Sequence, residues 1–293
     1  METIRIDDRL IRTLLPPRRA ESHKGDYGRA LLVCGAMGYT GAPYFAATGA
    51  VRSGAGLVDL AIPEPIWAVE AGKMAEAMVH PLPANAEGMV STAAIRPLLK
   101  RLASANVLLA GCGMGRSADV EQVVCALLDA ARVPVILDAD GINAVARHKD
   151  KIRNAAAPVV LTPHMGELRR LLGEDVVKDG ESRAEAAVRI AADWNVILVM
   201  KGHRTLVADP TGRVYENTTG NPGMARGGSG DALAGILAGL LAQGIPPTEA
   251  AAAAVYLHGL AGDLARDDRG EIGMTVTDLL DRLPDAFVRC RGI

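Results

Sequence analysis

A glycine-rich loop near the carboxyl end of the chain has the residue types best suited to chemistry. Its sequence, over residues 221–231, is Asn-Pro-Gly-Met-Ala-Arg-Gly-Gly-Ser-Gly-Asp, and it leads into a predicted helix over 231–243. Glycines let consecutive backbone N–H groups point the same way, and a helix N-terminus attracts an anion by about 0.3–1 kcal/mol. The loop therefore predicts a phosphate-binding site, with Gly228, Ser229 and Gly230 as the anion hole.

Asp231 ends this loop and begins the helix. An aspartate in a first helical turn is usually an ordinary helix cap. Beside a bound phosphate its charge would repel the ligand, unless the carboxylate takes a proton from an attacking hydroxyl. We therefore predict that Asp231 is the catalytic base of a phosphoryl transfer, a role typically worth about 10²–10⁴ in rate.

Other unusual segments follow predicted strands. Ligands of open parallel sheets bind outside the carboxyl ends of the strands, so these segments are expected to face one crevice. They are residues 35–41, 111–115, 138–141, 162–167 and 201–205.

Known nucleotide-binding motifs do not account for these segments. The chain has no Gly-x-x-x-x-Gly-Lys-Ser/Thr motif, which excludes a Walker-type enzyme. The glycine run 111–115 follows a strand, but Arg116 occupies the place of the third glycine of a dinucleotide-binding loop. This run is interpreted as a close backbone approach to a ligand, with a plain tight turn as the alternative.

Several single residues are open to two interpretations. The basic turn over 201–205 either passes close to a nucleotide or is simply solvated. Glu167 is predicted to reach a Mg²⁺ ion through water, although a glutamate in a first helical turn is often only a helix start. His164 is interpreted as a substrate contact, and His258, on an apolar helix, as a core or interface histidine.

Short apolar runs alternate with helical patterns through most of the chain, which is typical of a parallel sheet covered by helices on both faces. The predicted strands are 30–34, 57–62, 107–110, 134–137, 158–161 and 196–200. The predicted helices are 43–52, 120–131, 142–147, 167–172, 182–194, 231–243, 248–266 and 277–283. Runs 205–208 and 214–217, separated by Asp-Pro-Thr-Gly, predict an antiparallel hairpin. We expect one α/β domain over residues 1–293, with 1–22 as an N-terminal extension.

Composition limits the classes of partner. The formal net charge of −2 over 293 residues provides no basic field for nucleic acid. The cysteines form no CxxC pair, which favours reduced thiols. The sequence contains neither a signal-peptide core nor an apolar run of the roughly 20 residues that a membrane span needs. A cytoplasmic protein that contacts neither nucleic acid nor membrane is expected.

Four separated motifs together carry a family resemblance: His-Lys-Gly-Asp-Tyr-Gly (23–28), Gly-Tyr-Thr-Gly-Ala-Pro (38–43), Thr-Pro-His-Met-Gly-Glu (162–167) and the loop 220–231. From about residue 23 to 283 the chain resembles the ADP-dependent NAD(P)H-hydrate dehydratases of the ribokinase superfamily. The resemblance implies a ribokinase-like fold, in which a mostly parallel sheet has helices on both faces and a small antiparallel hairpin.

The resemblance also implies a reaction. ADP and the S epimer of hydrated NADH or NADPH (NADHX or NADPHX) would give AMP, phosphate and the intact reduced cofactor, with Mg²⁺ as metal. By analogy with the family, Ala42, Gly113, His164 and Asp231 would contact the hydrate. Contacts with the adenine nucleotide would come from Lys201, Gly202, His203, Arg204, Thr205 and Gly230.

The family further implies a homotetramer. An epimerase domain often precedes this domain in the family; because only about 22 residues precede the first motif, we expect the epimerase to be a separate protein. Arg226 stands where the family usually has Thr, and Met165 where it usually has Pro. Beside the loop, Arg226 would either add an ion pair or crowd the phosphate.

Two other functions remain open. One is a ribokinase-superfamily kinase for a small molecule such as a hydroxymethylpyrimidine or hydroxyethylthiazole, whose phosphorylated product would persist. The other is a nucleotide sensor without catalysis, which the presence of Asp231 and the loop glycines disfavours. Physical arguments from the residues decide neither ADP against ATP nor NADHX against NADPHX.

Overall fold

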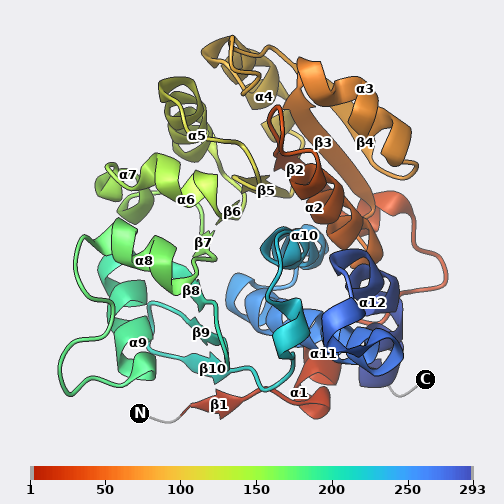
Figure 1. Cartoon of the computed structure of the whole chain (residues 1–293), viewed down its shortest axis with the longest axis vertical. Helices are drawn as coiled ribbons and strands as arrows, with labels where there is room; N and C mark the ends of the chain where they lie inside the picture. Colours follow the sequence, from red (N-terminus) through yellow and green to blue (C-terminus); the bar gives the residue numbers. More distant parts are fainter. Residues whose placement is uncertain (1–2, 292–293) are drawn as a thin grey trace.

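A single sheet of ten strands runs through the computed structural model, which describes residues 3–291 (Figure 1). The strand order is β1-β10-β9-β8-β7-β6-β5-β2-β3-β4. The strands are β1 (Ile4–Arg5), β2 (Arg29–Val33), β3 (Leu57–Pro63), β4 (Met78–Leu82), β5 (Val107–Ala110), β6 (Val135–Leu137), β7 (Val159–Leu161), β8 (Ile197–Met200), β9 (Leu206–Ala208) and β10 (Val214–Glu216). The neighbours from β4 to β8 are parallel, whereas β9 is antiparallel to both β8 and β10.

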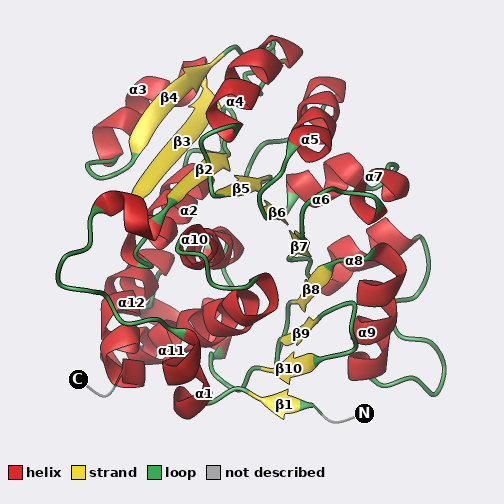
Figure 2. Cartoon of the chain, turned by 180° about the vertical axis from the view of Figure 1, so that it is seen from behind, coloured by secondary structure: helices red, strands yellow, loops and turns green. Residues whose placement is uncertain are grey.

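Alternate strand residues pack into two separate cores, one on each face of the sheet. In β5, for example, Val107 and Leu109 join one core, and Leu108 and Ala110 join the other. The first core is covered by α1 (Asp8–Leu14), α2 (Gly41–Arg52), α3 (Glu64–Lys73), α10 (Ser229–Ala242), α11 (Pro247–Gly273) and α12 (Val276–Arg291). The second is covered by α4 (Ile95–Leu102), α5 (Ala118–Ala130), α6 (Asp140–Val145), α7 (Lys149–Arg153), α8 (Met165–Leu172) and α9 (Arg183–Trp194). Figure 2 shows the two groups of helices on opposite sides of the sheet.

The predicted fold class is confirmed. The six predicted parallel strands correspond to β2, β3 and β5 to β8, and the predicted hairpin is the antiparallel pair β9 and β10. The last predicted helix, 277–283, is longer in the structure, where α12 continues to Arg291 through an internal proline, Pro284.

The sequence patterns missed elements at both ends of the sheet. β4 is an edge strand with a mixed burial pattern and a proline, so it lacks the continuous apolar run of a central strand. The extension 1–22 is also structured: β1 pairs with β10, and the Tyr256 hydroxyl lies 2.6 Å from Asp8 Oδ1. These short elements are held by long-range contacts that local periodicity does not report.

The sheet places the predicted site at its carboxyl edge. The loops after β2, β5, β6, β7 and β8 all leave the same edge, and α10 begins beside them. Among the described residues, none of the helices combines the length and apolar character needed to cross a membrane.

Candidate active site

The N-terminus of α10 forms a cradle in which position 228 has room for glycine alone. Gly228 precedes the helix with φ 96°, and a Cβ there would lie 2.5 Å from a ring carbon of Phe45. A Cβ on Gly230 would lie 3.2 Å from Lys201 Nζ. The Ser229 amide donates to the Arg226 carbonyl at 3.3 Å, whereas no bond from the Gly228 or Gly230 amide is seen among the described residues. These two amides at the helix start, beside the Lys201 cation, suit an anion.

Asp231 lies in the first turn of α10 among other ionisable groups. One oxygen of Asp231, one of Asp138 and the Cys112 thiol all lie within 4.8 Å of one another. Burial and the negative charge of Asp138 raise the pKa of Asp231 to about 7, although the Cys112 thiol and Lys201 oppose the rise. A carboxyl group with this pKa is suited to accept a proton near neutral pH.

Asp138 and Lys201 form a buried ion pair beneath Asp231. Lys201 Nζ lies 2.8 Å from Asp138 Oδ1, and the Thr162 hydroxyl donates to the same oxygen at 2.6 Å. Burial disfavours the Lys201 ammonium, but attraction to Asp138 prevails and raises the pKa of Lys201. Lys201 is therefore a fixed cation at the mouth of the cradle, where it can face a phosphoryl group.

Asp138 has no role that the sequence predicted. Its segment, 138–141, was expected at the crevice because it follows a strand, but its pairing partner, Lys201, lies 63 residues away. An acidic residue directly after a doubly buried strand was the available signal, because such a charge needs a nearby counter-ion.

His164 and Glu167 begin α8 as a reciprocal cap. His164 Nδ1 accepts from the Gly166 and Glu167 amides, and Glu167 Oε2 accepts from the His164 amide at 2.9 Å. The Lys201 amide donates to the Pro163 carbonyl at 3.0 Å, which brings this cap beside the ion pair. Glu167 is 6% exposed, and its other oxygen, Oε1, lies 3.4 Å from His164 Nε2.

The Glu167 carboxylate fits a Mg²⁺ ion that is bound mainly through water. Mg²⁺ usually takes one or two protein carboxylates and completes its shell with waters and substrate phosphates. Glu167 Oε1 makes no bond to a backbone amide, and Glu167 adds to the negative field at Lys201. The metal role of Glu167 stays a prediction.

Ala42 and Gly113 lie against each other on the β2 and β5 side of the crevice. Gly113 has φ 63°, and a Cβ there would come within 2.7 Å of Ala42 Cβ and 3.1 Å of Tyr39 Cβ. The glycine run thus lies close to the start of α2, and the predicted close approach to a ligand stays a prediction. Both residues lie at the predicted substrate side, and their contact with a hydrate stays a prediction.

The segment 201–205 divides into two parts. Lys201 points into the crevice, whereas Gly202, His203 and Arg204 form an exposed turn between β8 and β9. Thr205 closes this turn through its hydroxyl, which donates to the Gly202 carbonyl at 3.0 Å. Lys201 brings the start of this turn beside Gly230 of the cradle, and the contacts of residues 201–205 with a nucleotide stay a prediction.

Arg226 neither crowds the cradle nor contributes an ion pair to it. Its guanidinium donates to the Gly223 carbonyl at 2.9 Å and to the carbonyls of Glu271 and Ile272 at 3.4 and 2.5 Å. Arg226 thus holds the loop before α10 to the end of α11.

His258 is buried behind the same loop, as predicted. Its Nε2 lies 3.4 Å from the Ser229 hydroxyl, and burial lowers the pKa of His258 to about 4. The imidazole is therefore neutral near pH 7 and supports the start of α10 without adding charge.

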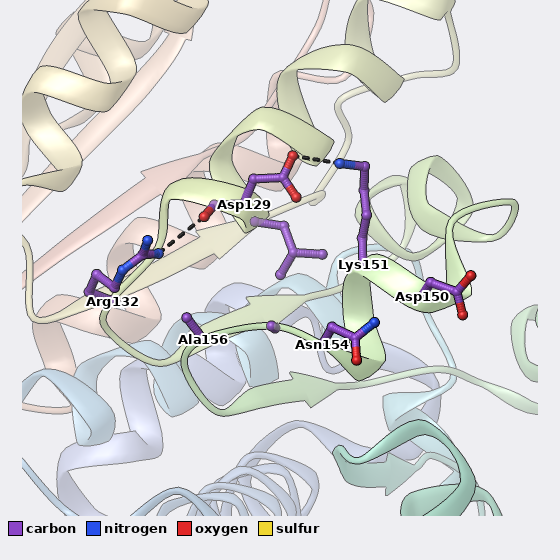
Figure 3. A pocket seen from close by; sticks show the side chains of 8 residues that line it. Asp129, Arg132, Asp150, Lys151, Asn154 and Ala156 are labelled. Carbon is purple, nitrogen blue, oxygen red and sulfur yellow. Dashed lines mark hydrogen bonds and ion pairs between the residues drawn. The ribbon is translucent and has the colours of Figure 1, made fainter.

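A cavity of about 470 Å³ lies at the amino ends of β6 and β7, away from this site (Figure 3). Two of its charged side chains are engaged: Lys151 Nζ lies 2.5 Å from Asp129 Oδ2, and the Arg132 guanidinium donates to the Asp129 backbone carbonyl. We assign the chemistry to the crevice because the perturbed carboxyl group and the glycine cradle are both there.

The sheet order, the hairpin and the cradle at α10 together define a member of the ribokinase-like superfamily. A ribokinase-like protein from Enterococcus faecalis superposes with a TM-score of 0.84 at 29% identity, covering 98% of this chain and 96% of that one. An ADP/ATP-dependent NAD(P)H-hydrate dehydratase from Bacillus subtilis, co-crystallised with ATP and Mg²⁺, superposes with a TM-score of 0.82 at 32% identity, covering 99% of each chain.

Residues 30–285 match the model of the family described as NAD(P)H-hydrate dehydratase, and the chain belongs to this family. It is 48% identical to a bifunctional NAD(P)H-hydrate repair enzyme, Nnr, from Moorella thermoacetica. The alignment of 273 residues covers 93% of this chain and 52% of the relative. It is 37% identical to an ADP-dependent (S)-NAD(P)H-hydrate dehydratase from Neisseria meningitidis, over 86% of this chain and 82% of that one. The chain thus spans about half the length of the bifunctional relative.

Proposed function

We propose that this protein is an ADP-dependent hydro-lyase that converts (6S)-NADHX and (6S)-NADPHX to NADH and NADPH. The observation that carries the proposal is Asp231, whose pKa is raised to about 7 at the glycine cradle of α10. The names of the relatives from Neisseria meningitidis and Bacillus subtilis support the substrate.

The first step is a phosphoryl transfer. Asp231 takes the proton of the hydroxyl on the hydrated nicotinamide ring, and the oxygen attacks the terminal phosphorus of ADP. The bond between that phosphorus and the bridging oxygen breaks, and AMP leaves. The backbone amides of Gly228 and Gly230 and the Lys201 ammonium stabilise the charge on the transferred group, and the Ser229 amide would join them on release from the Arg226 carbonyl.

The second step is an elimination. The phosphorylated carbon is bonded to the ring nitrogen, whose lone pair expels inorganic phosphate. Loss of a proton from the neighbouring carbon then restores the conjugated ring. The hydroxyl oxygen of the hydrate leaves as part of the phosphate, so the net result is dehydration coupled to hydrolysis of ADP to AMP.

Mg²⁺, when bound, would neutralise charge on the phosphate oxygens of the nucleotide. Glu167 would hold it through water. Two orientations then follow from the geometry: Asp138 fixes Lys201 toward the cradle, and the cap formed by His164 fixes the Glu167 carboxylate. The Mg²⁺ in the Bacillus subtilis crystals supports this choice of metal.

The assembly and the partners are part of the same proposal. Because the Moorella thermoacetica relative is named bifunctional and is about twice as long as the matched region, we propose a functional partnership with an NAD(P)HX epimerase. A homotetramer, as in the family, is the proposed assembly, and analytical ultracentrifugation tests it.

Incubation of the protein with enzymatically hydrated NADH, Mg²⁺ and either ADP or ATP tests the function. The absorbance of reduced nicotinamide should return, with one AMP and one phosphate formed per NADH when ADP is used. No recovery with either nucleotide would refute the proposal. A phosphoester that persists after the transfer would instead identify a small-molecule kinase.

A further inference from the structure

The helix α3 packs against the back of the loop that joins β2 to α2. This loop, residues 34–40, leads into Gly41 and Ala42. A Cβ on Gly35 would lie 2.9 Å from Ile66 Cδ1, so Ile66 of α3 touches the loop directly. One helical turn later, Glu70 and Lys73 occupy the same side of α3.

Glu70 is an unusual buried carboxylate. It has no exposed surface, and its Oε2 atom lacks a hydrogen-bond partner among the described residues. Burial raises the pKa of Glu70, while hydrogen bonding and attraction to Lys73 oppose the rise. A carboxylate in this position is costly, and such groups require an explanation beyond packing.

The Lys73 ammonium joins Glu70 to the loop. Lys73 Nζ lies 2.8 Å from Glu70 Oε1 and donates to the Thr40 carbonyl at 3.2 Å. Glu70 therefore keeps the cation in place, and the cation holds the last residue before α2. The other end of the segment is held by the Met37 amide, which donates to the Gly88 carbonyl at 3.0 Å.

The held segment lies on one side of the crevice only. Tyr39, 57% exposed, and Ala42 both lie beside Gly113, whereas the cradle and Lys201 belong to other elements. Phe45 of α2 lies against Gly228 at the cradle, but it lies beyond the held residues, so a change at α3 should alter the hydrate side of the crevice more than the phosphate side.

We propose that Glu70 and Lys73 are positioning residues for the hydrate half of the site: they hold residues 37–42 against Gly113 and so set the affinity for the hydrated nicotinamide substrate. The inference rests on the proposed function. It assigns to α3 a role in substrate recognition without any direct contact with the substrate.

The test compares Lys73→Met with Lys73→Arg and with Lys100→Met, a matched control at the exposed end of α4. Lys73→Met should raise the KM for the hydrate about tenfold, which is about 1.4 kcal/mol, because the charged hydrogen bond to the Thr40 carbonyl is lost. The dissociation constant of ADP, measured by calorimetry, should change much less than the KM for the hydrate, because only Phe45 of α2 reaches the cradle. Lys73→Arg should restore most of the hydrate affinity, and Lys100→Met should match the wild type.

Two further measurements separate this role from a purely structural one. Glu70→Gln should raise the hydrate KM in the same direction, and the double variant Glu70→Gln/Lys73→Met should be no worse than Lys73→Met if the two act as a unit. Amide hydrogen exchange over residues 37–42 should accelerate in Lys73→Met but not in Lys100→Met.

An unchanged hydrate KM in Lys73→Met would overturn the inference, as would an equal loss of hydrate and ADP affinity. A lower melting temperature with both affinities unchanged would assign the pair to stability alone and would also overturn it. Absence of turnover in the wild type would instead refute the proposed function, and hydrogen exchange would still show whether the pair holds the loop.

Discussion

Replacement of Asp231 by Asn should greatly reduce turnover and, at the same time, stabilise the fold by an amount that grows with pH up to about 7. The two side chains are nearly the same size, so packing around the first turn of α10 is preserved. Asn cannot accept the proton of the substrate hydroxyl, and the rate should fall by about 10²–10⁴.

The stabilisation follows from the raised pKa. Burial, together with Asp138, raises the pKa of Asp231 from 3.8 to about 7, which corresponds to a free-energy cost on the order of 4 kcal/mol for the ionised form. Between these two pH values the folded protein binds more protons than the unfolded chain. The free energy of unfolding therefore decreases as the pH rises from 3.8 to about 7, and this contribution is constant above about 7.

The assay is denaturant unfolding of the wild type and Asp231→Asn from about pH 5 to about pH 9, across the interval in which Asp231 changes charge. The stability difference in favour of the variant should grow with pH up to about 7 and then stay level. In parallel, kcat/KM of the wild type should rise with pH and level off above about 7, because only the ionised Asp231 accepts a proton. A stability difference that does not change with pH, or a variant that retains wild-type activity, would refute the assignment of Asp231 as a base with a raised pKa.

Three further substitutions test the surroundings of this residue. Lys201→Met should destabilise the fold by about 3–5 kcal/mol, because it leaves the Asp138 carboxylate buried and unpaired. It should also move the midpoint of the pH–rate profile upward, because Lys201 lowers the pKa of Asp231, and a midpoint at or below that of the wild type would contradict this. Gly228→Ala should abolish nucleotide binding measured by calorimetry, since the added methyl group would meet the Phe45 ring at 2.5 Å. Its matched control is Gly244→Ala, which has a similar φ of 81° but open space around it and should bind nucleotide normally. Arg226→Thr should lower the melting temperature, because it removes the contacts to the carbonyls of Gly223, Glu271 and Ile272. The KM for ADP should change by less than about twofold, because these contacts lie outside the cradle. A large increase in this KM would show that Arg226 acts on the nucleotide.

The local sequence was sufficient to predict the central fold and the position of the crevice. Strands such as 107–110 and 196–200 are continuous apolar runs, because both of their faces are buried, and such runs are visible without a structure. The carboxyl ends of parallel strands meet at one edge, so the segments that follow them had to converge. The loop 227–231 predicted an anion hole in the same way, because glycines before a helix expose backbone amides whatever the rest of the fold.

The charge state of the site depended on contacts that no local pattern contains. Asp138 and Lys201 are 63 residues apart and meet only because β6, β7 and β8 are neighbours. The raised pKa of Asp231 comes from burial and from Asp138, and the glycines and the aspartate alone would equally describe an exposed helix cap.

The two ends of the sheet also separate what the sequence predicts from what only tertiary contacts decide. The sequence predicted no strand in the extension 1–22, where β1 pairs with β10. It assigned no chemistry to α3, where Glu70 and Lys73 lie beside the loop that leads into α2. Residue types and spacing thus specified which groups could react. Tertiary packing decided which of them carry charge and what holds them in place, because burial and ion pairing depend on neighbours that are distant in the chain.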